Sequence, residues 1–251
     1  MKTLLMHPQS ARQFATSNSA VASATRLLSC LFAVLLCFSF SAVDAQAQAK
    51  AKTSIKVEPL KLSAAQKRVL ASGGVHVNVK KSGDVNSGLV IGLVKGTVSE
   101  IAPIIAQCGK YSDWRDSILN TGVIKTESAT VVVCKGTAKV PFPASNRDGH
   151  FRVENKDANV GGTDSFTSVY GYIENTGNLN DMYGYWLLQP FEGNPEFTVV
   201  KHILNVDIGG WLPDFLVRWA TSRVLPDTIY GLRMRHAQLH KVKGLKKPTY
   251  W

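Results

Sequence analysis

The residues that could carry out general acid–base chemistry are few and dispersed. His202, Asp207 and Tyr185 are the first candidates, because their side chains exchange protons and they lie in or beside neighbouring strand-like segments. The six histidines are scattered, and the sequence has no metal-type His/Cys cluster, nucleophile elbow, Walker loop or paired-carboxylate signature. The sequence therefore predicts no metal and no cofactor, and it leaves catalysis as an alternative function.

The cysteines divide into two groups. Cys30 and Cys37 lie in an N-terminal apolar run, whereas Cys108 and Cys134 lie in the body of the chain. In an oxidising compartment the second pair could form one disulfide, but the spacing alone does not establish it, and two buried thiols are the alternative. Both possibilities stay open at this point.

The N-terminal segment has the pattern of an export signal. Arg26 leads into the apolar run 27–40, which is followed by small residues and the step Val43-Asp44-Ala45. A membrane-spanning helix needs about 20 apolar residues, and the run 27–40 is shorter than that. A permanent membrane anchor is therefore the alternative to a cleaved signal. We expect residues 1–45 to be a signal peptide and the protein to be exported, to the periplasm or outside the cell.

The chain is basic, with a formal net charge of +11. Residues 1–45 hold three basic residues and one acidic residue, so the charge without them is +9. A positive surplus suits anionic partners such as lipid headgroups or nucleic acid, and export argues against nucleic acid. Solubility through net charge is an equally good explanation.

The order of elements predicts one α+β domain over residues 73–240. Residues 46–72, rich in Ala, Lys and Gln, are expected to be a flexible or partly helical spacer. Alternation of Val75, Val77 and Val79 predicts a strand, and residues 89–98 complete a hairpin. With 45% apolar and 19% charged residues, the chain can bury a substantial core.

A helical section is predicted after this hairpin, with Ser99 as its N-cap and residues 120–122 as its end. Further strands are expected at 130–140, 150–154, 165–174, 183–190 and 197–206, which together indicate an antiparallel sheet. The apolar stripe over residues 211–240 predicts one long terminal helix, bent at Pro226.

Two motifs stand at element boundaries. One is Pro141-Phe142-Pro143-Ala144-Ser145-Asn146-Arg147-Asp148, which precedes a strand, and the other is Asp207-Ile208-Gly209-Gly210-Trp211-Leu212-Pro213, which opens the last helix. Together they resemble landmarks of START domains, the StAR-related lipid-transfer family of the SRPBCC/Bet v 1-like superfamily. The resemblance implies the helix-grip fold, a curved antiparallel sheet wrapped around a long C-terminal helix that together enclose an apolar tunnel. Gly149-His150 departs from the family pattern and puts the local strand start in doubt.

Strand alternation assigns side chains to this tunnel. The expected ligand-binding residues come from three strands and the last helix, and they are Phe151, Val153, Trp186, Leu188, His202, Leu204, Trp211, Phe215 and Trp219. Each could instead serve packing alone, and His202 could be a satisfied structural histidine. Arg147 and Asp148 are expected to pair and fix a turn.

The C-terminal tail, residues 241–251, combines cations with Tyr250 and Trp251. Lys241, Lys243, Lys246 and Lys247 could dock the protein on an anionic membrane, or the tail could be a solvated terminus.

The sequence favours a non-enzymatic carrier or sensor of an apolar lipid. The alternatives are a polyketide cyclase/aromatase-like enzyme of the same fold and an envelope protein-interaction module.

Overall fold

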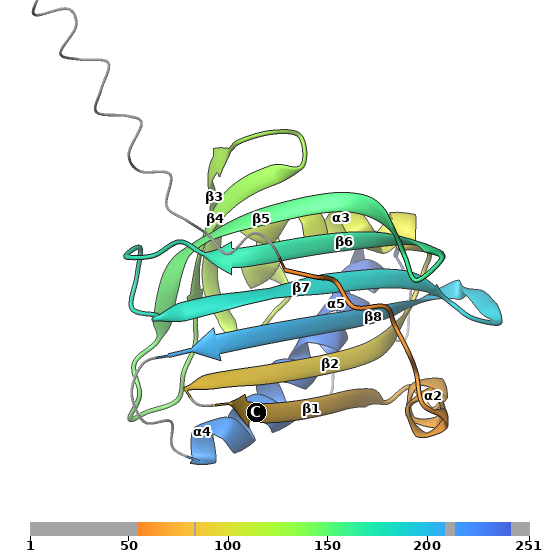
Figure 1. Cartoon of the computed structure of the whole chain (residues 1–251), viewed down its shortest axis with the longest axis horizontal. Coiled ribbons are helices and arrows are strands. Elements are labelled where there is room, and N and C mark those ends of the chain that lie inside the picture. The colour runs from red at the N-terminus through yellow and green to blue at the C-terminus, as the bar shows by residue number, and fades with distance from the viewer. Residues whose placement is uncertain (1–54, 83, 209–213, 242–251) are drawn as a thin grey trace, which may run out of the picture. The chain divides into compact units, whose positions relative to one another are not determined.

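An open sheet of eight antiparallel strands forms the centre of the computed structural model (Figure 1). The structure describes residues 55–82, 84–208 and 214–241, all within one compact unit. The strands are β1 Val75–Ser82, β2 Val85–Lys95, β3 Ile118–Thr126, β4 Val131–Ala138, β5 Arg147–Val160, β6 Thr163–Tyr172, β7 Asp181–Phe191 and β8 Asn194–Asp207. Their order in the sheet is β1-β2-β8-β7-β6-β5-β4-β3, so the long β2–β8 pairing brings the two ends of the domain together.

The antiparallel sheet was predicted, but one of its strands was not. The predicted helical section ends early: α3 covers Val98–Ala106, a short 3-10 helix η1 covers Cys108–Asp113, and β3 follows. Thr97, not Ser99, precedes the first turn, and its N–H donates to the Glu100 carboxylate at 2.8 Å. Tyr111 and Trp114, which fall within the predicted helical section, both lie beyond α3.

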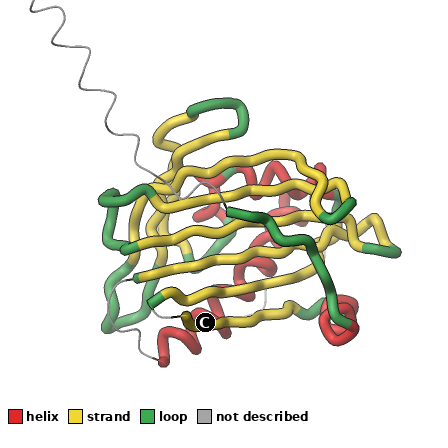
Figure 2. Tube along the Cα trace, viewed as in Figure 1, coloured by secondary structure: helices red, strands yellow, loops and turns green. Residues whose placement is uncertain are grey.

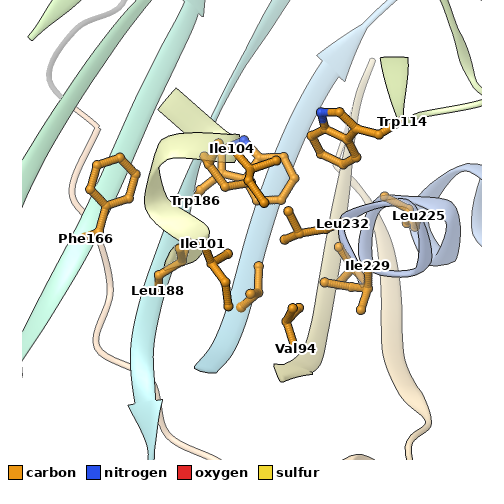
Figure 3. Packing of buried hydrophobic residues seen from close by; sticks show 13 residues of the cluster. Val94, Ile101, Ile104, Trp114, Phe166, Trp186, Leu188, Leu225, Ile229 and Leu232 are labelled. Carbon is orange, nitrogen blue, oxygen red and sulfur yellow. The ribbon is translucent and has the colours of Figure 1, made fainter. Parts of the chain in front are cut away.

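The two faces of the sheet are covered differently (Figure 2). The main core lies on the inner face, where α3 and α5 pack against β2, β7 and β8. Figure 3 shows Ile101 and Ile104 from α3 meeting Trp186, Leu188 and the α5 side chains. Burial of these side chains at roughly 25 cal/mol per Å² is the main force that holds the helices on the sheet.

The C-terminal helical region is continuous, but it changes from α-helix to π-helix and back to α-helix. It runs through α4 Asp214–Trp219, the π-helical segment η2 Ala220–Val224 and α5 Leu225–Leu239. Pro226 has no N–H for an i−4 carbonyl, and the preceding N–H of Leu225 bonds to the carbonyl of Ala220, five residues back. The irregularity expected at Pro226 is thus a π-segment that ends there.

Two glycines on β2 let α5 lie close to the sheet. A Cβ at Gly88 would come within 3.1 Å of Leu225, and one at Gly92 would overlap Ile229. Both helix residues are buried. The absence of side chains at these two strand positions therefore sets the distance between helix and sheet.

The segment before Gly73 packs on the outer face of the sheet. Helix α2, Ala64–Ala71, has a Ser63/Gln66 capping box, and Leu70 is buried against Ile91 and Val199. The chain leading to α2 crosses the outer face (Figure 1), where Lys201 Nζ donates to the Glu58 carbonyl at 3.0 Å. From residue 55 on, the segment expected to be a spacer therefore contains a helix and packs on the sheet.

Cys108 and Cys134 form a disulfide, which resolves the alternative left open by their spacing. The bond joins η1 to β4 beside Val153. Within the described residues, no helix combines the length and apolarity required to cross a membrane.

Candidate ligand-binding site

A pocket of about 270 Å³ lies between the inner face of the sheet and the C-terminal helical region. Its walls come from β1, β2, the strands β3 to β8, η1, α4 and η2. Most of the side chains that line it are aliphatic or aromatic, among them Val79, Phe151, Met182, Leu204 and Leu216. Such a wall excludes water more readily than it excludes an apolar molecule.

The structure brings together six of the nine side chains expected in the tunnel: Phe151, Val153, Trp186, His202, Leu204 and Trp219. Leu188 shares the inner face but is fully buried in the main core, beyond the pocket. Phe215 lies on α4 with 37% of its surface exposed, because the short helix presents it to solvent and turns Leu216 inward. Trp211 lies outside the described residues.

His202 is the polar centre of the pocket wall. Its ring stacks on Trp186, with the ring centroids 3.9 Å apart, and its Nε2 lies 2.9 Å from the Tyr170 hydroxyl. Burial lowers the pKa of His202 well below its usual value, and the positive charge of Arg115 lowers it further. His202 is therefore neutral at physiological pH, and its Nδ1 has no hydrogen-bond partner among the described residues.

Tyr170 reaches His202 across a whole strand. Tyr170 is on β6 and His202 on β8, and Gly184 of β7 lies opposite Tyr170. A Cβ at Gly184 would come within 2.6 Å of the Tyr170 hydroxyl oxygen, so glycine opens the path. The hydroxyl also donates to the Ile203 carbonyl at 3.2 Å, and burial raises the pKa of Tyr170 far above its usual value. Tyr170 is thus a neutral hydrogen-bonding group.

Arg115 is a buried cation on the pocket wall that the sequence analysis missed. Only 8% of its surface is exposed, and its Nη2 donates to Thr228 Oγ1 at 3.2 Å. Its Nε is buried and has no hydrogen-bond partner in the part of the chain that the structure describes. In the sequence it lies between Trp114 and Asp116, and such a mixture of charged and aromatic residues is also found in surface turns. The local sequence therefore gave no signal that Arg115 is buried.

Arg147 and Asp148 do not pair. They are the first two residues of β5, so their side chains point to opposite faces of the sheet. Arg147 lines the pocket and donates to the Ser145 carbonyl at 2.6 Å, while the backbone of Asp148 bonds to Asn178. Alternation from Phe151 back to Arg147 was the signal that could have placed this arginine inward.

The strand start at Gly149-His150 is regular despite its departure from the family pattern. Residues 147–154 pair with β4 without interruption. Gly149 is buried, and a Cβ there would overlap the ring of Tyr172. The ring of Tyr172 thus fills the space that a side chain at position 149 would need, which explains the glycine.

The three acid–base candidates are not assembled in one place. Tyr185 points to the outer face, where its hydroxyl accepts a hydrogen bond from the Glu58 N–H at 3.3 Å. Asp207 lies at the end of β8 and accepts from Asn180 Nδ2, and only His202 of the three lines the pocket. Adjacent strand residues face opposite ways, so Tyr185 and Trp186 could not both point inward.

Two further predictions concern ions and the tail. The described part of the chain contains no group of three or more His, Cys, Asp or Glu residues that could hold a metal ion. Lys241 follows α5 with a φ of 54°, and Lys243, Lys246 and Lys247 lie outside the described residues. The membrane-docking hypothesis for the tail stays a prediction.

No protein-family model matches the sequence, and no curated protein does. Solved structures do match. The STAR-related lipid transfer protein from Xanthomonas axonopodis, a fragment, is 17% identical with a TM-score of 0.54, over 72% of this chain and 98% of that one. Human StAR-related lipid transfer protein 5 is 16% identical with a TM-score of 0.54, over 87% of this chain and 99% of that one. The shared eight-stranded sheet with its C-terminal helix shows that this chain has the START-type helix-grip fold.

Proposed function

We propose that this protein is an exported START-type protein that binds an apolar lipid in the pocket and carries or senses it. The observation that supports this most strongly is the pocket itself, which has a largely apolar wall between the sheet and the C-terminal helices. The named lipid-transfer proteins of the same fold support lipid as the class of ligand. A pocket of this kind disfavours the reading as a pure protein-interaction module, which needs no interior space.

The energetics favour an occupied pocket. A single-chain lipid would remove several hundred Å² from water, worth several kcal/mol at about 25 cal/mol per Å² before ordering costs. Micromolar binding is therefore within reach without any covalent chemistry.

Blocking the pocket tests the proposal. Leu204 on β8 lines the pocket, and its neighbour Ile203 points to the other face of the sheet. We expect Leu204→Trp to lower the affinity for the neutral apolar dye Nile red by about tenfold or more, because the indole fills the space, and Ile203→Trp to leave it unchanged. If both folded variants bind the dye like the wild type, the pocket is not the binding site.

Export is part of the proposal. The apolar run 27–40 supports it, and so does the Cys108–Cys134 disulfide, because such bonds persist mainly in oxidising compartments. In a fractionated bacterial host, the full chain should appear outside the cytoplasm in a form shortened at its N-terminus. A full-length cytoplasmic product would contradict export.

Docking of the basic tail on anionic membranes is the remaining part of the proposal. Co-flotation with phosphatidylglycerol vesicles, compared with a chain truncated after His240, tests it. Equal flotation of the two proteins would show that the tail does not contribute to membrane binding.

A further inference from the structure

We propose that the lipid held in this pocket carries one anionic group, such as the carboxylate of a long-chain carboxylic acid, and that Arg115 binds this group. The inference rests on the proposed function, since it names the class of ligand for the same pocket.

The charged side chains among the described residues of the pocket wall are all positive. Arg115 and Arg147 belong to the wall, together with the more exposed Lys135 and Lys139, and none of the described residues that line it is Asp or Glu. Wall cations without wall carboxylates create a positive potential in a low-dielectric space, which favours an anion and disfavours a cation.

Arg115 is the residue on which this potential centres. A buried guanidinium loses most of its hydration and requires hydrogen-bond acceptors in exchange. Within residues 55–82, 84–208 and 214–241, Arg115 has a neutral acceptor, Thr228 Oγ1, while its buried Nε has none. A ligand carboxylate would supply both the missing acceptor and the opposite charge, and charge-assisted bonds of this type are the strong ones.

The titratable groups on the pocket wall close to Arg115 are neutral, and the nearby carboxylate of Asp227 is held by other donors. Burial keeps Tyr111 and Tyr170 protonated by raising the pKa of each, and His202 is neutral. Asp227 is buried next to Thr228 but does not line the pocket, and its Oδ2 accepts from the N–H and hydroxyl of Ser117. The side of Arg115 that faces the pocket is thus left for a ligand.

The size of the pocket restricts the apolar part of the ligand. Its volume of about 270 Å³ is at or below the lower end of ordinary ligand pockets, about 300 to 1,000 Å³. A single acyl chain suits this space better than the two chains of a phospholipid. Together with Arg115, this indicates a single-chain amphiphile with an anionic head.

Ligands with one chain and three different heads test the inference on the wild-type protein. Dodecanoate, 1-dodecanol and dodecyltrimethylammonium are titrated against bound Nile red, at a pH where the acid is ionised. We expect dodecanoate to displace the dye at a concentration about tenfold or more below that of dodecanol, and the ammonium compound to be the weakest.

Two arginine variants locate the effect. Arg115→Gln should weaken dodecanoate binding by about tenfold to a hundredfold, because a charged hydrogen bond is lost, and should leave dodecanol nearly unchanged. Arg152→Gln is the matched control, since Arg152 lies outside the pocket wall and pairs with Glu127 at 2.8 Å. If Arg115→Gln does not fold, two measurements still test the inference. They are dodecanoate binding by Arg115→Lys and the selectivity of the wild type among the three head groups.

The outcomes are distinguishable. If Nile red does not bind and no ligand stabilises the protein, the proposed function itself fails. If the dye binds but dodecanol or the ammonium compound competes as well as dodecanoate, lipid binding stands and the anionic class is overturned. A preference for dodecanoate that survives in folded Arg115→Gln overturns the role of Arg115.

Discussion

At the scale of single residues, the pocket wall joins an apolar lining to buried polar side chains, among them His202 and Arg115. His202 is 2% exposed, stacks on Trp186 and meets the Tyr170 hydroxyl. The histidine is therefore held neutral by its surroundings, and its contribution to stability depends on pH.

Acidification should destabilise the protein through His202. Its folded-state pKa is lowered, so below the unfolded-state pKa of about 6.5 the unfolded chain takes up a proton that the folded chain does not. The free energy of unfolding should fall as the pH decreases below about 6.5, by up to about 1.4 kcal/mol per pH unit, and this part should be absent in His202→Gln.

Urea denaturation of both proteins across this pH range measures the effect. His236, whose pKa is also lowered by burial, is present in both and cancels in the comparison. The stability difference between wild type and variant should narrow as the pH falls. A difference that stays constant with pH would show that His202 titrates normally.

How far the sequence predicts the site follows from strand geometry. Alternation placed Phe151, Val153, Trp186, His202 and Leu204 on the face that lines the pocket, because successive strand residues must point to opposite sides. Arg115 follows η1 outside any strand, and only tertiary packing turns it inward. Phe215 shows the same limit for a short helix, whose orientation depends on its neighbours.

At the scale of elements, the helix–sheet contact depends on positions that have no side chain. Gly92 lies under Ile229, which is fully buried, so the methyl group of an alanine has no free space there. Helix α5 would have to move away from β2 to accept it.

Gly92→Ala should lower the free energy of unfolding by about 1 to 3 kcal/mol, as is usual for overpacking. Gly136→Ala on β4 is the control, because its nearest contact, the methyl group of Thr121, would be at an ordinary 3.6 Å. Thermal or urea unfolding measures both. Equal stability of the two variants would contradict the close packing of α5 on β2.

The disulfide fixes η1 to the sheet at one end of the pocket. Its cysteines are 26 residues apart, and closing a loop of that size stabilises a protein by about 3.5 kcal/mol in the chain-entropy model. Reductant should therefore lower the free energy of unfolding by about this amount in the wild type and have no effect on a Cys108→Ala/Cys134→Ala variant. Alkylation of Cys108 and Cys134 in the untreated, unfolded protein would contradict the bond.

Element prediction succeeded where periodicity was unambiguous and failed where it was not. The strand hairpins and the C-terminal helix follow directly from period-2 and period-3.6 patterns. Beyond Ala106 the apolar residues still fit a helix, yet the chain turns into η1 and then β3. The disulfide and the pairing of β3 with β4 are long-range interactions, and these override local spacing.

At the scale of the whole molecule, the sheet, the C-terminal helical region and the disulfide-linked η1 enclose one largely apolar space. Filling that space entirely with side chains would have made a more stable core, so the unfilled space supports a ligand-binding role. The general fold was predictable from the order of elements and two motifs. The size and charge of the interior were not, because they depend on how side chains from distant elements meet.

The most direct measurement is mass spectrometry of an organic extract of the purified, natively folded protein. The account predicts an apolar molecule in an amount comparable to that of the protein, and its loss from the folded Leu204→Trp variant. A wild-type extract free of such a molecule, from a protein that also fails to bind Nile red, would contradict lipid binding in the pocket.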